Sequence, residues 1–203
     1  MDEPLLVIVA TSNKGKLAEI RSTVDLPGFE FTTAADLGFE PLEVEETGTT
    51  FLENARLKAR AYAERFGMSA LADDSGLQVD ALDGEPGVYS SRYAGVDGDD
   101  AANNRKLLEA LAAVAEPDRT ARFRSVVVLV HPEGTETVAE GACEGVIART
   151  PRGEGGFGYD PLFRPLAAGG RTMAELTLEE KNKISHRGAA LLALRKALAP
   201  EAF

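Results

Sequence analysis

The chain has 203 residues, of which 44% are hydrophobic and 27% charged, which is typical of a globular protein with a sizeable core. Its 33 acidic residues outnumber 22 basic ones, and the net charge of −11 argues against nonspecific binding to nucleic acid, because contacting many phosphates needs a basic surface. The single cysteine, Cys143, excludes an internal disulfide and is expected to be a small buried hydrophobe.

The N-terminal residues predict no export or membrane insertion. The apolar run Leu5–Ala10 is too short for a signal peptide, and no apolar stretch approaches the length of a membrane span. We therefore expect a cytoplasmic protein without a membrane partner.

The first predicted strand, Leu5–Ala10, leads into a polar loop, Thr11–Lys16, and then into a helix predicted over Leu17–Val24. This layout is typical of phosphate-binding sites, because a helix N-terminus offers free N–H groups. It is not a P-loop, since a leucine stands where Ser or Thr must follow the lysine. The loop is either an anion site of another kind, with Lys14 or Lys16 as the cation, or a solvated turn with an asparagine cap.

A second strand is predicted at Phe29–Thr33, and a strong helix signal follows. Thr50 and Glu53 form a capping box, and apolar residues recur at helical spacing up to Gly67. The acidic cluster Glu43–Gly48 directly before this helix contains candidate metal ligands, although acids at this position are commonly complements of the helix dipole.

The centre of the sequence is the stretch Ala70–Ser91. It opens with Ala70–Ala72, a short buried strand that is expected to end at Asp73 and Asp74, with a tight turn at Ser75–Gly76. Carboxylates at such a point can hold a hard cation or can cap backbone N–H groups. The stretch by itself leaves both interpretations open.

The second half begins with a predicted loop over Pro86–Gly95. Asp97–Asp100 then lead into a helix that is predicted to end near Ala115. The β-branched run Phe123–Val130 predicts a strand, and Thr135–Cys143 predicts its antiparallel partner in a hairpin.

A glycine-rich segment, Gly153–Gly158, matches G-x-G-x-x-G, but no helix can begin at the following Tyr159–Pro161, so a dinucleotide fingerprint is rejected. The segment predicts a loop that presents Phe157, Tyr159 and Asp160. An aromatic ring beside a carboxylate suits a flat ring ligand, and a packed loop aromatic is the alternative.

The last predicted helix, Thr177–Ala197, opens with a second capping box. Lys183 and Arg187 are four residues apart and share a face of this helix, with Lys181 and His186 to its sides. This cationic face is a candidate anion site or, alternatively, a solvated charged face. Its leucines are expected in the core; they are Leu191, Leu192, Leu194 and Leu198.

Taken in order, these segments resemble the inosine/xanthosine triphosphate pyrophosphatase family. The matching segments are Thr11–Lys16, Glu45–Gly48 with Phe51–Ala55, Ala72–Leu77, Phe157–Pro161 and Ser185–Gly188. The resemblance covers about Leu5–Leu198, and Ser12 departs from the glycine that many members have.

The resemblance implies an α/β fold with an elongated, mixed, twisted sheet flanked by helices, in a single domain over residues 1–203 that has two lobes and a central cleft. It also implies a homodimer, Mg²⁺ as cofactor and a purine nucleoside triphosphate as substrate.

The resemblance also implies a role for individual residues. Glu45 and Asp74 would bind Mg²⁺, Asp74 would be the proton acceptor, and Ser75 would touch the substrate. The triphosphate would be held by Thr11, Ser12, Asn13, Lys14, Gly15 and Lys16. The nucleotide pocket would be formed by Phe157, Gly158, Tyr159, Asp160, Lys181, His186 and Arg187.

The implied reaction converts ITP, dITP and XTP to the monophosphate and pyrophosphate. The charge balance agrees, because a triphosphate entering an acidic protein needs lysines and a divalent cation to neutralise it. A Maf-like pyrophosphatase is the close alternative, and Ser185-His186-Arg187 argues against it. The other alternative is a nucleotide-binding regulator without turnover. Glu45 and Asp74 disfavour this alternative, since a pure binder needs no group that activates water.

Overall fold

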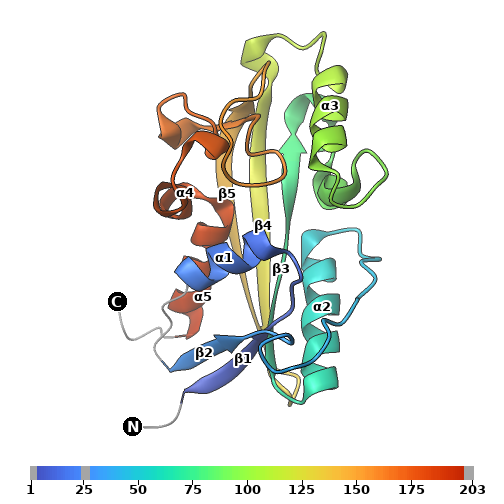
Figure 1. Ribbon diagram of the computed structural model, residues 1–203, viewed down its shortest axis with the longest axis vertical. Coiled ribbons are helices and arrows are strands. Elements are labelled where there is room, and N and C mark those ends of the chain that lie inside the picture. The colour runs from blue at the N-terminus through green and yellow to red at the C-terminus, as the bar shows by residue number, and fades with distance from the viewer. Residues whose placement is uncertain (1–3, 24–27, 199–203) are drawn as a thin grey trace. The chain divides into compact units, whose positions relative to one another are not determined.

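The structure is a computed structural model that describes residues 4–23 and 28–198 (Figure 1). Its six strands form one sheet in the order β2-β1-β3-β4-β5-β6. The strands are β1 Leu5–Val9, β2 Phe29–Thr32, β3 Ser69–Val79, β4 Thr120–Val130, β5 Glu136–Ile147 and β6 Phe163–Pro165. Parallel pairing of β1 with β2 and β3 and antiparallel pairing of β5 with β6 make the sheet mixed, which confirms the expected fold class.

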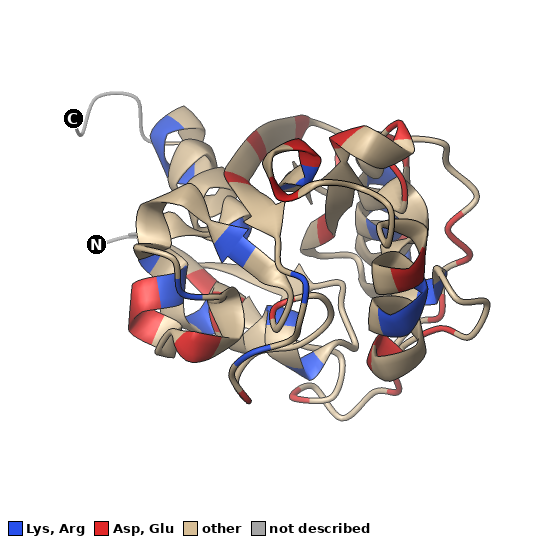
Figure 2. Ribbon diagram, turned by 90° about the horizontal axis from the view of Figure 1, so that it is seen from above, with Lys and Arg blue, Asp and Glu red and all other residues tan. Residues whose placement is uncertain are grey.

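The five α-helices are α1 Lys14–Thr23, α2 Phe51–Phe66, α3 Asp100–Ala110, α4 Leu178–Ile184 and α5 His186–Leu198. Both predicted capping boxes are present, at Thr50 before α2 and at Thr177 before α4. Acidic and basic residues are interspersed along the helices (Figure 2). None of the described helices combines the length and the apolar character that crossing a membrane requires.

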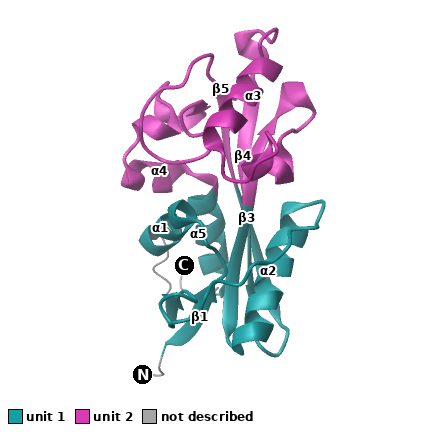
Figure 3. Ribbon diagram, turned by 45° about the vertical axis from the view of Figure 1, so that its right-hand side comes forward, with its two compact units in different colours: residues 1–74, 125–141, 187–203 teal, residues 75–124, 142–186 magenta. Residues whose placement is uncertain are grey.

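The chain divides into two compact units (Figure 3). Unit 1 comprises residues 1–74, 125–141 and 187–203, and unit 2 comprises residues 75–124 and 142–186. The long strands β3, β4 and β5 each contribute residues to both units. The boundary in β3 falls between Asp74 and Ser75, so the acidic pair belongs to unit 1.

Unit 1 is built on the parallel strands β1, β2 and β3, with Val7 opposite both Phe31 and Ser69. The buried residues of one core cluster of unit 1 are aliphatic, and α1 and α5 contribute Ile20 and Leu191 to it. Leu194 is buried as predicted, whereas Leu192 is 49% exposed, which corrects its assignment to the core. Consecutive helical residues point in different directions, so Leu191 and Leu192 cannot both face the sheet.

Unit 2 has its own core around the residues of β3 that follow the boundary. Leu77 and Val79 are fully buried there with Leu107 and Leu111 from the α3 segment. Cys143 is also part of this core, as predicted, and burial raises the pKa of its thiol to about 11.

The predicted turn at Ser75–Gly76 is wrong, because β3 runs without interruption from Ser69 to Val79. The acids do not end the strand, since basic side chains neutralise them where they lie. Leu77 and Val79 then return to the apolar pattern and give the second half of β3 a core of its own.

Other predicted boundaries also move. The single helix predicted over Thr177–Ala197 is two helices, because Ser185 has an extended backbone (φ −76°, ψ 154°). α3 ends at Ala110 instead of near Ala115, and the buried guanidinium of Arg119 donates to the Leu111 carbonyl oxygen (2.6 Å) just beyond it.

Three smaller differences concern loops and ends. The predicted loop over Pro86–Gly95 contains a 3₁₀ helix, Gly87–Arg92. α1 starts at Lys14, three residues before the predicted start, and its predicted end at Val24 lies outside the described residues. The hairpin is confirmed in outline, because β4 and β5 are neighbours joined by five residues, too few for a parallel crossover.

Candidate functional site

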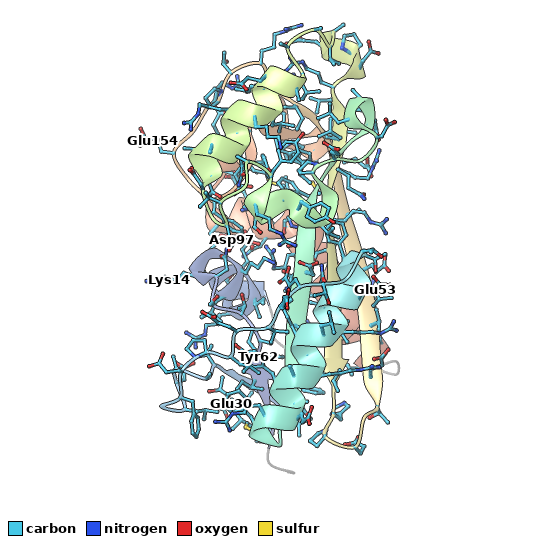
Figure 4. All side chains as sticks on the ribbon, turned by 90° about the vertical axis from the view of Figure 1, so that its right-hand side faces the viewer. Lys14, Glu30, Glu53, Tyr62, Asp97 and Glu154 are labelled. Carbon is cyan, nitrogen blue, oxygen red and sulfur yellow. The ribbon has the colours of Figure 1, made fainter. Side chains whose placement is uncertain are left out.

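The first candidate element is the N-terminus of α1 in unit 1. Asn13 caps the helix, because its Oδ1 accepts the Lys16 backbone N–H (3.0 Å), and its own N–H donates to Thr11 Oγ1 (3.2 Å). Lys14, Gly15 and Lys16 therefore form the first helical turn and not a loop, and Ser12 and Lys14 are exposed. Figure 4 shows Lys14 at the outer edge of unit 1. A helix start with two lysines and no acid in its first turn suits an anion.

Asp73 is the hub of a buried ionic network in the same unit. Its carboxylate pairs with Lys16 Nζ (2.9 Å) and Arg187 Nη2 (3.2 Å) and accepts a hydrogen bond from Ser125 Oγ. Arg187 also pairs with Glu19 of α1. Burial alone would raise the pKa of Asp73, but the charges of Arg187 and Lys16 hold it well below its ordinary value. The ion pairs and the Ser125 hydrogen bond thus link α1, β3, β4 and α5.

Asp74 lies next to this network in a different environment. Only 5% of the residue is exposed, and Lys58 Nζ of α2 lies 3.6 Å from its Oδ1. Burial raises the pKa of Asp74, although the positive charges of Lys58 and Lys16 oppose the rise. A raised pKa makes this carboxylate a stronger proton acceptor than an ordinary aspartate.

Lys58 is the residue of this ion-paired group in unit 1 that the sequence analysis did not identify. Its Nζ donates to Glu46 Oε1 (2.7 Å) and to the Asp73 carbonyl oxygen (2.9 Å). The sequence signal for Lys58 was its position on the buried face of the predicted helix. Phe51, Ala55, Lys58 and Tyr62 form an i, i+4, i+7, i+11 series on α2. A lysine on an otherwise buried stripe needs an acidic partner.

Glu46 lies beside Lys58, whereas Glu45 does not belong to this ion-paired group. Glu45 is exposed, and Glu46 is half-buried and adds to the negative charge felt by Asp74. Across the residues that the structure describes, no three acidic, histidine or cysteine side chains gather into a cluster able to hold a metal ion. The assignment of Glu45 as a metal ligand stays a prediction.

The loop that carries both glutamates is fixed to the start of α2. Gly48 N–H donates to Asn54 Oδ1 (2.8 Å), and Thr49 and Thr50 N–H donate to Glu53 Oε2. Figure 4 shows Glu53 at this end of α2, with Tyr62 farther along the helix. A Cβ at Gly48 would come within 2.6 Å of Asn54 Oδ1, so only glycine allows this approach.

In unit 2, Phe157 and Asp160 lie close together with Lys181 of α4. Lys181 Nζ donates to Asp160 Oδ2 (2.5 Å) and lies 4.7 Å from the centre of the Phe157 ring. Asp160 also accepts the Phe157 N–H (2.9 Å). The structure thus brings together three of the predicted pocket residues, with the Lys181 cation at the half-buried ring and the Asp160 carboxylate bonded to both Lys181 and the Phe157 backbone.

Gly158, between them, is held by two α3 residues that the sequence analysis did not identify. Its N–H donates to Asp100 Oδ2 (2.7 Å), and its carbonyl oxygen accepts from Asn104 Nδ2 (2.8 Å). Gly158 has φ +62°, a conformation that favours glycine. Tyr159 is buried, and its hydroxyl donates to the Ser90 carbonyl oxygen (2.9 Å), so it anchors the loop from inside.

The remaining predicted residues are also in unit 2. The His186 ring is buried and stacks on Phe123 with 4.8 Å between centroids, and Ser75 is half-buried in β3. Lys183 is exposed and pairs with Glu179 (2.7 Å), which matches the solvated alternative for that lysine.

The described residues form a mixed α/β protein. Unit 1 has a helix start with two lysines and no acid in its first turn, close to the buried Asp74 carboxyl, and unit 2 has an aromatic loop with fixed polar groups. The Ham1 family model matches residues 7–197. The chain therefore belongs to the Ham1 family.

Related proteins agree with this assignment. The chain is 53% identical to a dITP/XTP pyrophosphatase of Desulforamulus reducens over 91% of each chain. It is similar to the structure of a HAM1 protein from Coxiella burnetii, with a TM-score of 0.84 and 45% identity over 97% of this chain and 99% of that one. A Mycobacterium abscessus structure named nucleoside-triphosphatase / dITP/XTP pyrophosphatase matches with a TM-score of 0.75 and 49% identity over 94% and 98%.

Proposed function

We propose that this chain hydrolyses dITP, XTP and ITP to the nucleoside monophosphate and pyrophosphate, and so keeps noncanonical purines out of nucleic acids. The observation that carries the proposal is the buried Asp74 carboxyl with its raised pKa, beside the basic start of α1. Relatives named dITP/XTP pyrophosphatase that match nine-tenths of the chain support the substrate class.

We propose Mg²⁺ as the cofactor, held by Asp74 and Glu45 as the family resemblance implies. The Asp74 and Glu46 carboxylates and the Asp73 carbonyl oxygen converge on the Lys58 ammonium, which shows that these oxygen donors suit a cation, and Glu45 is next to Glu46 in the sequence. Mg²⁺ is commonly bound through one or two carboxylates together with substrate phosphates, so a cluster of three acids is not required. When bound, the ion would neutralise phosphate charge and polarise the scissile bond.

The residues of unit 1 then have separate roles. The N–H groups at the start of α1, with Lys14 and Lys16, bind the distal phosphates. Asp74 accepts a proton from the water that attacks the α-phosphorus, and pyrophosphate leaves while cations stabilise its charge. Asp73 positions Lys16 through their 2.9 Å ion pair.

Unit 2 supplies base recognition. Phe157 offers a ring on which a purine can stack, and Lys181 and Asp160 offer a fixed donor and acceptor beside it. His186 is proposed to contact the base, as the family resemblance implies. The resemblance implies the same contact for Arg187, but this residue belongs to unit 1, where its side chain is 1% exposed and pairs with Glu19 and Asp73. A homodimer and a cytoplasmic location are further parts of the proposal that rest on the resemblance alone.

The test is to incubate the purified chain with ITP and Mg²⁺ and to identify the products by ion-exchange chromatography. We expect inosine monophosphate and pyrophosphate. Inosine diphosphate and orthophosphate as first products would refute cleavage at the α-phosphorus, and binding without turnover would favour the regulator. Faster turnover of other modified nucleotides would favour a Maf-like pyrophosphatase.

A further inference from the structure

Lys58 occupies a position at which oxygen atoms from different segments converge. Its ammonium lies 2.7 Å from Glu46 Oε1 in the loop before α2, 2.9 Å from the Asp73 carbonyl oxygen and 3.6 Å from Asp74 Oδ1 in β3. The side chain is only 12% exposed. All of these atoms belong to unit 1.

An ammonium group has three donors and no acceptor, so it satisfies converging oxygens as a small cation does. Two carboxylates and a carbonyl are also the hard donors that a divalent cation prefers. The lysine is therefore a cation tethered among the oxygens that would otherwise attract a metal ion. A lysine side chain is a cation at neutral pH, and the three oxygen atoms within 3.6 Å hold this one in place.

The cations around Asp74 oppose the binding of a free divalent cation. The positive charges of Lys58 and Lys16 both act on the Asp74 carboxylate. A cation that approaches Asp74 is therefore repelled by these two charges and must compete with Lys58 for the same oxygens. Such repulsion is strong at these separations because the groups are buried.

We infer that Lys58 is a positioning residue that holds Glu46 and Asp74 together without metal and keeps free divalent cations from binding tightly. The metal then enters with the triphosphate, because the phosphate oxygens add the negative charge that the site lacks. This inference rests on the proposed function insofar as it takes a divalent cation to be the cofactor. It assigns to the protein an order of binding: the nucleotide and its metal arrive together.

The test uses Mn²⁺ as the probe and the full chain without nucleotide, with free Mn²⁺ measured by electron paramagnetic resonance. We expect Lys58→Met to bind Mn²⁺ more tightly than wild type, with a Kd lower by about tenfold or more, because one opposing charge is removed. Lys58→Arg keeps the charge and should bind as weakly as wild type. Lys196→Met removes an exposed lysine of α5 and should change nothing.

A double variant shows where the more tightly bound Mn²⁺ lies. Adding Asp74→Asn to Lys58→Met should abolish the tighter binding if the Mn²⁺ lies at the oxygens that Lys58 releases. An unchanged Kd in Lys58→Met, or a gain that persists with Asp74→Asn, would overturn the inference. If Lys58→Met does not fold alone, recovery of its melting transition by Mn²⁺ supports the inference, and no recovery refutes it.

The two proposals can fail separately. The Mn²⁺ experiment involves no nucleotide and no turnover, whereas the proposed function is tested by the products that wild type forms from ITP. Wild-type hydrolysis together with an unchanged Kd in Lys58→Met would refute only the role of Lys58. Absence of hydrolysis in wild type would refute the proposed function, whatever the Mn²⁺ data show.

Discussion

Arg187 and Asp73 meet at 3.2 Å inside unit 1, with side chains only 1% and 0% exposed. The contact joins the first turn of α5 to the middle of β3. Since the same arginine pairs with Glu19 and the same aspartate pairs with Lys16, one connected network runs from α5 to the proposed phosphate-binding turn of α1. Asp74, next in the chain, pairs instead with Lys58 of α2 (3.6 Å), so the two neighbouring acids have different partners, and we propose a structural role for Asp73 and a chemical role for Asp74.

The chemical role of Asp74 predicts the effect of Asp74→Asn. Asn has nearly the same shape but cannot accept the proton of the attacking water and is a poorer metal ligand, so kcat for ITP should fall by about 10²-fold or more. Circular dichroism and binding of a non-hydrolysable ITP analogue should remain close to wild type. Near-normal kcat in this variant would remove Asp74 from the reaction.

The structural role of Asp73 predicts a pH-dependent loss of stability. Its pKa is lowered in the folded state, so its stabilising contribution is complete above the unfolded pKa of about 3.9 and disappears as the pH falls through the folded value. Asp73→Asn should lower the free energy of unfolding at pH 7 by about 3–5 kcal/mol, because it leaves buried cations uncompensated. The difference from wild type should be constant from about pH 5 to 8 and shrink below about pH 4.

Urea unfolding at a series of pH values measures this difference. Asp97→Asn is the matched control, because Asp97 is an exposed carboxylate, and it should change stability by less than about 0.5 kcal/mol. A wild-type advantage that instead grew towards acid pH would have the wrong sign for a lowered pKa and would contradict the assignment.

The two hydrogen bonds from α3 residues to Gly158 predict an effect on substrate affinity. Asn104→Leu removes the 2.8 Å hydrogen bond to the Gly158 carbonyl oxygen and loosens the turn between Phe157 and Asp160. One such bond is worth about 1 kcal/mol, so KM for ITP should rise about fivefold while kcat changes little. Steady-state kinetics and the melting temperature should be measured together, with Arg105→Ala, an exposed position on the same helix, as control. A fall in kcat at constant KM would contradict a role in holding the base.

The sequence predicted the elements whose signals are local. The capping box at Thr50, the αL residue Gly67 and the apolar repeat between them specify α2 without reference to the rest of the chain. The same holds for the run Phe123–Val130, which lies within β4. In these segments the local preference and the tertiary packing agree.

The errors lie where tertiary contacts override local signals. Asp73, Asp74, Ser75 and Gly76 have the composition of a strand end. Cations from α1, α2 and α5 pair with Asp73 and Asp74, and this neutralisation allows β3 to continue. Those partners are far away in the sequence, so no local pattern could identify them. Lys58 is the exception, since its place on the buried stripe of α2 was visible without a structure.

The last prediction concerns discrimination between bases. Hypoxanthine and xanthine have an oxygen acceptor at C6, where adenine has an amino donor. Arg187 has only donors, so at C6 it would satisfy the oxo group and oppose adenine. A site built for such a bond discriminates by about 10⁴-fold. Phe157 can stack on any purine, so its contribution should be the same for each base.

We therefore expect Arg187→Ala to lower kcat/KM for ITP much more than for ATP, and Phe157→Ala to lower both alike. The burial of Arg187 against Glu19 and Asp73 requires a folding control, because removing it alone leaves carboxylates uncompensated. The double variant Glu19→Gln/Arg187→Ala removes one charge of each sign. It should show the same change in the ratio of kcat/KM for ITP to kcat/KM for ATP as Arg187→Ala. Guanine also has a C6 oxygen, so the ratio of kcat/KM for ITP to kcat/KM for GTP should not change in Arg187→Ala. An unchanged ratio of kcat/KM for ITP to kcat/KM for ATP in this variant would exclude Arg187 from base recognition.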